Sequence, residues 1–115
     1  MIDDNIVRNR RNTHRDKVNI KARYFVIGSS LDYRDCDIID ISRTGLALST
    51  KITPTQIITR NKMIYIDICI PSSLNIITIC GEIKRVSVLP DIIQFVIHSN
   101  NIIDKFTYNT LIMMG

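Results

Sequence analysis

Tryptophan is absent from this 115-residue sequence, aromatic residues make up only 6%, and there are three cysteines and three prolines. The cysteines are odd in number and none belongs to a C-x-x-C pair, which argues against a disulfide framework and against a structural zinc site. We expect Cys36, Cys69 and Cys80 to be small buried apolar residues in a reducing compartment. His14 and His98 have no metal-ligand spacing to cysteine or carboxylate groups, so we expect both at the surface and no metal cofactor.

A secretory signal and long apolar runs are missing as well. No apolar run approaches the roughly 18 residues that suggest a membrane span. The first residues, M-I-D-D-N, are acidic and lead into arginines instead of an apolar segment. We therefore expect a cytoplasmic protein without a membrane partner. No combination of nucleophile, base and orienting group is visible, so we do not expect an enzyme.

Apolar residues make up 45% of the sequence and its mean hydropathy is +0.10, so most of the chain should fold around one core. Its formal charge of +4 is unevenly placed. Residues 1–23 hold seven Lys and Arg against three Asp and Glu, whereas residues 24–115 hold eight of each kind. A basic N-terminal segment attached to a neutral body favours an anionic partner, such as a nucleotide or a nucleic acid.

Alternating apolar and polar residues predict that the chain is built from β-strands. The first alternation begins at Val18 and ends at Val26, with every second residue apolar. A bulge or bend is predicted at Gly81, inside a long strand. Because no helix separates the strands, we predict an antiparallel sheet closed into a barrel, which leaves no exposed edge. The further predicted strands are residues 36–41, 46–49, 63–70, 74–88 and 92–98.

The last segment changes to a helical period, because its apolar residues recur at spacings of three and four. We predict a C-terminal helix over an open mouth or face of the barrel, with Asn101 as its N-cap and Asp104 at position N3. The chain then divides into an extended arm at residues 1–17 and a barrel with its helix at residues 18–115. The residues that carry the helical period are Ile102, Ile103, Phe106, Thr110, Leu111 and Met114.

Arginines dominate the N-terminal arm, and Arg11-Asn-Thr-His-Arg15 has an R-x-x-x-R spacing. A planar guanidinium binds a phosphate or the O6/N7 edge of guanine with two hydrogen bonds, and it also stacks on a base. A short arginine-rich arm is, however, more often a solvated basic terminus. Lys84 and Arg85 form a second basic pair, which is either a solvated strand face or a floor beneath an anionic ligand.

The segment Asp40-Ile-Ser42-Arg-Thr-Gly45 marks a corner between two predicted strands. Asp40 and Ser42 are two residues apart, so on a strand they project to the same face. The carboxylate can accept hydrogen bonds from the N1 and N2 donors of guanine, and the hydroxyl can bond a neighbouring ligand atom. Gly45 supplies a positive φ or a close backbone approach. The same residues also suit a plain turn, in which Asp and Ser bond their own backbone.

An R-x-x-x-R arm followed about twenty-five residues later by D-x-S-x-x-G, in a small all-β chain, resembles the PilZ domain. The resemblance covers nearly the whole chain. It implies a six-stranded antiparallel barrel with a flexible arm and a C-terminal helix, and it implies binding of the bacterial second messenger cyclic di-GMP. Arg11 and Arg15 match the motif arginines that hold guanine edges and phosphates. Asp40, Ser42 and Gly45 match the second motif, which holds a guanine and shapes the wall.

The resemblance carries further expectations. In the family, the residue before the first motif arginine influences how many stacked ligand molecules bind, and here it is Arg10, which suits an intercalated pair. Family members often have a small residue shortly before the phenylalanine of the last strand, whereas Asp91-Ile-Ile-Gln precedes Phe95 here, so that wall of the site differs. Ligand binding would order the arm and create a surface for a protein partner, in processes such as motility or virulence.

Two other functions stay open at this point. A PilZ-fold adaptor would act through protein contacts without a nucleotide, although the intact motifs argue against it. A small basic barrel would bind RNA or single-stranded DNA, but such proteins use exposed aromatic side chains as stacking platforms, and this sequence has few aromatics.

Overall fold

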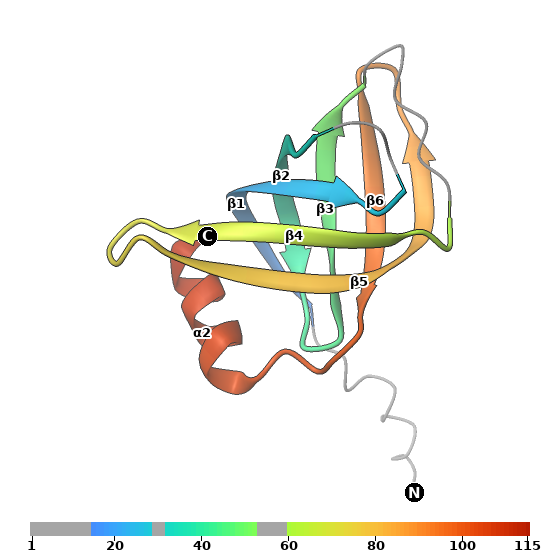
Figure 1. Cartoon of the computed structure of the whole chain (residues 1–115). Helices are drawn as coiled ribbons and strands as arrows, with labels where there is room; N and C mark the ends of the chain where they lie inside the picture. The colour runs from blue at the N-terminus through green and yellow to red at the C-terminus, as the bar shows by residue number, and fades with distance from the viewer. Residues whose placement is uncertain (1–14, 29–31, 53–59) are drawn as a thin grey trace, which may run out of the picture.

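The fold is a closed antiparallel β-barrel followed by a helix (Figure 1). The computed structural model describes residues 15–28, 32–52 and 60–115. The strand order around the barrel is β1-β2-β3-β6-β5-β4, and every neighbouring pair is antiparallel. This confirms the predicted barrel. The elements are β1 (Asp16–Val26), β2 (Arg34–Ile41), β3 (Gly45–Lys51), β4 (Met63–Ile70), β5 (Asn75–Val88), β6 (Ile92–Ser99) and α2 (Lys105–Met114).

Each strand turns every second side chain into the barrel. Most of these inward side chains are isoleucines. In β1 the inward set contains Ile20, Ala22 and Tyr24, as the sequence pattern predicts. Tyr24 meets Phe95 edge to face, with the ring centroids 5.7 Å apart. The core isoleucines on the other strands are Ile38, Ile41, Ile64, Ile66, Ile68, Ile79, Ile83, Ile93 and Ile97.

Strand β1 starts two residues before the alternation that predicts it. Asp16 and Lys17 pair with Ile41 and Asp40 of β2, ahead of a register shift between Lys17 and Ile20. Because both side chains are polar, the alternation of apolar residues does not extend to this part of the strand. As a result, Arg15 stands directly at the start of the barrel.

The predicted bulge at Gly81 is misplaced, because the register of β5 with β6 shifts between Ile83 and Arg85. Gly81 serves another purpose there. A Cβ atom at this position would lie 2.4 Å from the carbonyl oxygen of His98, so glycine allows β5 and β6 to approach closely.

Helix α2 begins later than predicted, with Asp104 as its N-cap. The Asp104 carboxylate accepts a hydrogen bond of 2.8 Å from the Thr107 backbone N–H, which holds the pKa of this carboxyl below its usual range. Asn101 therefore lies outside the helix. The Ile103 carbonyl accepts a hydrogen bond from the Arg43 Nε instead of from a helix N–H, so Ile103 lies outside the helix.

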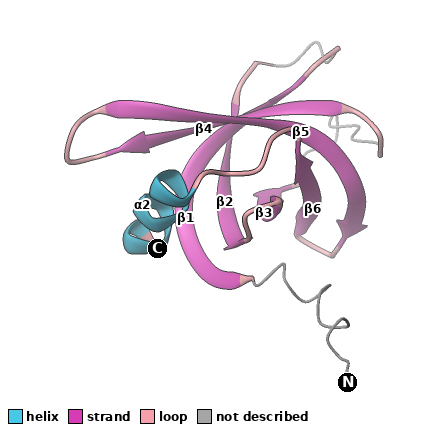
Figure 2. Ribbon diagram, turned by 90° about the horizontal axis from the view of Figure 1, so that it is seen from below, coloured by secondary structure: helices cyan, strands magenta, loops and turns pink. Residues whose placement is uncertain are grey.

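Helix α2 packs beside β1 (Figure 2). Its Leu111 side chain is fully buried. The apolar period predicted one buried face, but only part of that set is buried. Ile103 and Leu111 join the core, whereas Ile102 and Phe106 are exposed to solvent.

The cysteines differ in burial. Cys36 is buried as predicted, and burial raises the pKa of its thiol to about 12. Cys80 is half-buried, and the prediction is wrong for Cys69, which is exposed because it points outward from β4 next to the buried Ile68. His98 is exposed as predicted. Among the described residues, no group of three His, Cys, Asp or Glu side chains is placed to hold a metal, and no helix could cross a membrane.

Candidate functional site

Arg15 and Asp40, one from each of the two predicted motifs, meet at the start of β1. The guanidinium Nη1 of Arg15 donates a hydrogen bond to Oδ1 of Asp40, and the two groups form an ion pair. The antiparallel pairing of β1 with β2, which sets Lys17 opposite Asp40, brings these residues together across 25 positions of sequence. Their side chains keep 42% and 23% of their surface exposed, so both are accessible to a ligand.

A bulge in β2 gives Asp40 its position. The register with β3 shifts between Ile38 and Asp40, and the buried positions move from Ile38 to Ile41. Such an extra residue bends a strand and redirects the side chains beside it. The bulge therefore leaves the Asp40 carboxylate half-buried at the surface, whereas Ile38 and Ile41 on either side of it in the sequence enter the core.

Ser42 lies in a different environment from Asp40. Strand β2 ends at Ile41, and Ser42 is fully buried in the turn that follows. Its hydroxyl accepts a hydrogen bond from the backbone N–H of Thr44 and donates one to the carbonyl of Gly45, each at 3.2 Å. The prediction that Ser42 and Asp40 share one face fails because the alternation of a strand does not continue into this turn.

Gly45 is pressed against β6. A Cβ atom at this position would lie 2.1 Å from the carbonyl oxygen of Ile97, whereas the backbone φ of Gly45 is not positive. Of the two reasons that the sequence offers for glycine here, the close backbone approach is the one that applies.

The same corner is bonded to the segment that precedes α2. The Arg43 Nε donates to the carbonyl of Ile103 at 2.9 Å, and the backbone N–H of Ile103 donates to the carbonyl of Arg43 at 2.8 Å. A second link joins the start of β1 to the helix itself, where the Tyr108 hydroxyl donates to the Asp16 carboxylate. Sequence reasoning misses both links, because neither has a recognisable spacing.

A comparison with protein families decides what this arrangement belongs to: the sequence model of the PilZ domain matches residues 9–107. The chain belongs to the PilZ domain family. PilZ domains are receptors for cyclic di-GMP, which they bind as a ligand, and they serve as binding and adaptor modules. A search of curated proteins finds no match.

Solved structures of PilZ proteins share the fold. The Bacillus subtilis inhibitor of motility (MotI/DgrA) superimposes with a TM-score of 0.62 at 14% identity, over 92% of this chain and 50% of that one. The PilZ domain of CeSA, from a cellulose-synthesizing bacterium, gives a TM-score of 0.55 at 16% identity, over 87% of this chain and 92% of that one. The present chain thus spans half the length of the motility inhibitor.

The remaining predicted PilZ residues fall into two groups. Arg10 and Arg11 lie outside the described residues, so their place at the site stays a prediction. Lys84 and Arg85 are exposed on β5, and the Lys84 ammonium lies 3.3 Å from the Glu82 carboxylate. That neighbour offsets part of the positive charge that a ligand would meet there.

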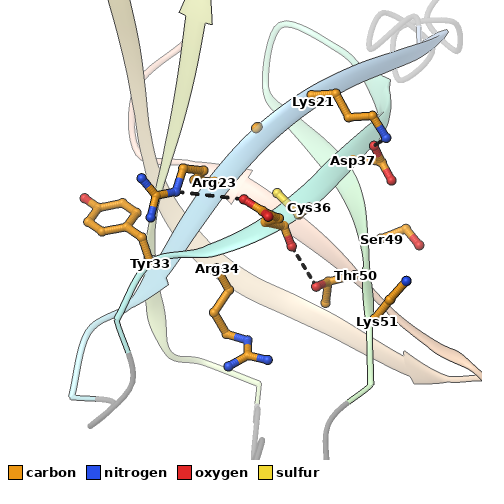
Figure 3. Close-up of a pocket in the computed structure, with 11 residues that line it drawn as sticks. Lys21, Arg23, Tyr33, Arg34, Cys36, Asp37, Ser49, Thr50 and Lys51 are labelled. Carbon is orange, nitrogen blue, oxygen red and sulfur yellow. Dashed lines mark hydrogen bonds and ion pairs between the residues drawn. The ribbon is translucent and has the colours of Figure 1, made fainter.

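An open groove of about 860 Å³ lies on the β1-β2-β3 side of the PilZ barrel (Figure 3). The ammonium of Lys21 is 2.7 Å from the Asp37 carboxylate, and this hydrogen bond raises the pKa of Lys21. Arg23 lies 3.9 Å from the Asp35 carboxylate. Each acidic group offsets one of the basic groups that line the groove. None of the described motif residues lines it, so the groove is separate from the contact between Arg15 and Asp40.

Proposed function

We propose that this PilZ domain binds cyclic di-GMP at the contact between Arg15 and Asp40, orders its N-terminal arginine arm over the ligand, and signals to a protein partner. One observation supports this most: the two halves of the motif meet through an ion pair at an accessible position. A ligand that carries both guanine edges and phosphates suits a carboxylate and a guanidinium placed side by side.

Each group has a chemical role in this proposal. The Asp40 carboxylate accepts hydrogen bonds from the N1 and N2 donors of a guanine. Arg15, with Arg11 from the arm, binds phosphate or the O6/N7 edge of guanine. Arg10 contacts a second, stacked ligand molecule. Ser42 and Gly45 contribute by shaping the corner that holds Asp40, since the Ser42 hydroxyl is bonded within the turn.

The energetics allow the ion pair to change partners. An ion pair at the protein surface contributes only about 0–1 kcal/mol, so Arg15 and Asp40 give up little when they bond a nucleotide. Hydrogen bonds to charged groups contribute roughly 1.5–3 kcal/mol each. Fixing the arm subtracts from that gain, as in any segment that becomes ordered on binding.

The output of the proposed receptor is a contact with another protein. Of the two similar structures described above, one is an inhibitor of motility and the other a domain of CeSA from a cellulose-synthesizing bacterium. We propose that the present chain controls a process of this kind, motility or virulence among them. Because the proposed ligand is an intracellular messenger, the proposal places the chain in the cytoplasm.

Titration calorimetry with cyclic di-GMP tests the site. We expect Arg15→Ala, Arg11→Ala and Asp40→Ala each to weaken binding about ten- to a hundredfold. Arg23 and Asp35 provide matched controls, because they form a similar ion pair across the same two strands, away from the motif. Arg23→Ala and Asp35→Ala should leave the affinity unchanged. The molar ratio reports whether one or two ligand molecules bind.

The alternative of an adaptor that does not bind nucleotide has one observation in its favour, because the packing of Ser42 and Gly45 gives both residues a purpose without a ligand. A flat titration with folded wild-type protein would establish that alternative. If binding occurs but the control variants weaken it as much as the motif variants do, the ligand lies elsewhere on the barrel. Protection of residues 8–14 from hydrogen exchange by the ligand would test the ordering of the arm.

A further inference from the structure

Helix α2 exposes apolar side chains on the side opposite to the one that packs on the barrel. Phe106 and Met113 are 82% and 87% exposed, and Ile102, just before the helix, is 69% exposed. With 3.6 residues per turn, Phe106, Asn109 and Met113 form one stripe along the helix, directly opposite the buried Leu111. Large apolar side chains that gather on one exposed face mark a contact surface.

The stripe carries no ionised side chain. Lys105 is the one charged residue in α2, and it lies beside the stripe. A helix that binds a membrane surface has several Lys or Arg on its polar face, and α2 lacks them. A strongly charged protein partner would likewise find nothing to pair with. The surface therefore suits a partner whose own face is apolar and uncharged.

We propose that this partner is a second copy of the chain, with the two α2 helices packed antiparallel about a two-fold axis near Asn109. In this arrangement Phe106 of each copy faces Met113 of the other, so the same contact forms twice. Phe106 and Met113 are about 10.5 Å apart along the helix, and an antiparallel partner matches that spacing in reverse. Contacts between a thioether sulfur and an aromatic ring are favourable. Asn109 can donate to and accept from its own copy at the axis.

The surroundings of α2 permit this pairing. The helix is fixed on the barrel by buried Leu111 and by the bond from Tyr108 to Asp16, so the stripe always faces away from the barrel. Residues 24–115 hold equal numbers of acidic and basic groups, so two copies do not repel each other strongly here. One ten-residue helix from each copy buries less than the about 1,200 Å² of a stable interface, so we expect a weak dimer.

Sedimentation of the full chain without nucleotide tests the proposal, and its failure would leave the ligand proposal untouched. From about 5 to 500 µM, a span suited to a weak interface, the mass should rise from 13.2 kDa toward twice that value. Phe106→Lys or Met113→Glu alone should weaken association more than about thirtyfold, because each change enters the interface twice. Val88→Lys, at an apolar position 66% exposed near the far end of β5, is the matched control and should associate like wild type.

The antiparallel register makes a stricter demand. An equimolar mixture of the Phe106→Lys chain and the Met113→Glu chain should form a heterodimer, because the introduced lysine then faces the introduced glutamate. Neither variant should dimerise alone. Failure of the mixture to associate would overturn the register. A wild-type chain that stays at 13.2 kDa throughout, or one that instead floats with phosphatidylglycerol vesicles through Phe106 and Met113, would overturn the dimer.

Discussion

Gly45 is held in a space that admits no side chain. The carbonyl oxygen of Ile97 lies 2.1 Å from where its Cβ would be, and this oxygen belongs to the backbone of β6, which cannot rotate away as a side chain can. Gly28 offers a contrast, because it has a positive φ of 89° but nothing within 4 Å of its Cβ position. Gly45 is therefore required because there is no space for a side chain, whereas Gly28 is favoured because of its backbone conformation.

We expect Gly45→Ala to lower the free energy of unfolding by about 3 kcal/mol or more, since the strands β3 and β6 must separate to admit the methyl group. Gly28→Ala should cost only about 1–2 kcal/mol, the strain of a positive φ. Urea denaturation of both variants measures the difference. Equal losses would show that the contact between Gly45 and Ile97 does not limit stability.

At this scale the sequence predicts one contact of the candidate site and misses others. The meeting of Arg15 and Asp40 can be expected, because the two residues belong to the two halves of a family motif and carry opposite charges; their role in binding a ligand stays a prediction. Arg43 is not, because its partner is the backbone of Ile103, and any residue can offer a backbone carbonyl. The structural use of the Ser42 hydroxyl is also hidden, since the sequence does not distinguish a serine that bonds its own turn from a serine that bonds a ligand.

Among the elements, α2 and β1 are connected by a hydrogen bond between a phenol and a carboxylate. The Tyr108 hydroxyl donates to Asp16, and burial together with this bond raises the pKa of Tyr108 to about 12. Asp16 is next to Arg15, so the bond joins the helix to the strand end that carries the candidate site. The helix and the site are thus parts of one packed unit.

Tyr108→Phe should lower the free energy of unfolding by about 1 kcal/mol near neutral pH, because the bond is partly exposed. The raised pKa means that the folded state favours the protonated phenol. Its contribution is therefore complete below pH 10 and is lost as the pH rises from 10 to about 12. Urea denaturation of both proteins across this range should show their difference shrinking. A difference independent of pH would contradict the bond.

The strands themselves are predictable from alternation wherever apolar residues mark it. The start of β1 escapes, because Asp16 and Lys17 are polar on both faces. The N-cap of α2 is misassigned, because Asn101 and Asp104 are both good capping residues and the tertiary bond from the Arg43 Nε to the Ile103 carbonyl, which distinguishes them, leaves no trace in the sequence. The outward face of α2 is missed for a related reason, since the apolar period does not tell which apolar residues the barrel covers.

For the whole molecule, closure into a barrel can be predicted from a series of strands without helices between them. The order of the strands cannot, because β3 pairs with β6 and β1 with β4, and these partners are far apart in the chain. The uneven distribution of charge is also a property of the whole chain. The excess of positive groups lies in residues 1–23, and the rest of the chain is neutral.

A neutral barrel with one basic arm should bind its ligand with a moderate dependence on salt. Raising NaCl from 0.1 to 1 M shortens the Debye length from about 10 Å to about 3 Å. We expect the affinity for cyclic di-GMP to fall by less than about tenfold, since few charges are screened. The affinity for a nucleic acid would instead fall by several powers of ten over the same salt range. Calorimetry for the nucleotide and fluorescence anisotropy for a labelled single strand distinguish these outcomes.

Ser42 and Gly45 are both buried at the corner, and contacts within the barrel account for both without a ligand. Ser42 completes a turn and Gly45 makes room for β6, so a barrel of this kind needs both whether or not it has a nucleotide to bind. A related chain that has ceased to respond to the messenger should therefore keep the serine and the glycine while its arginines and aspartate drift. Under the proposed function, Arg15 and Asp40 are the positions that distinguish a receptor from a relative that no longer binds the messenger.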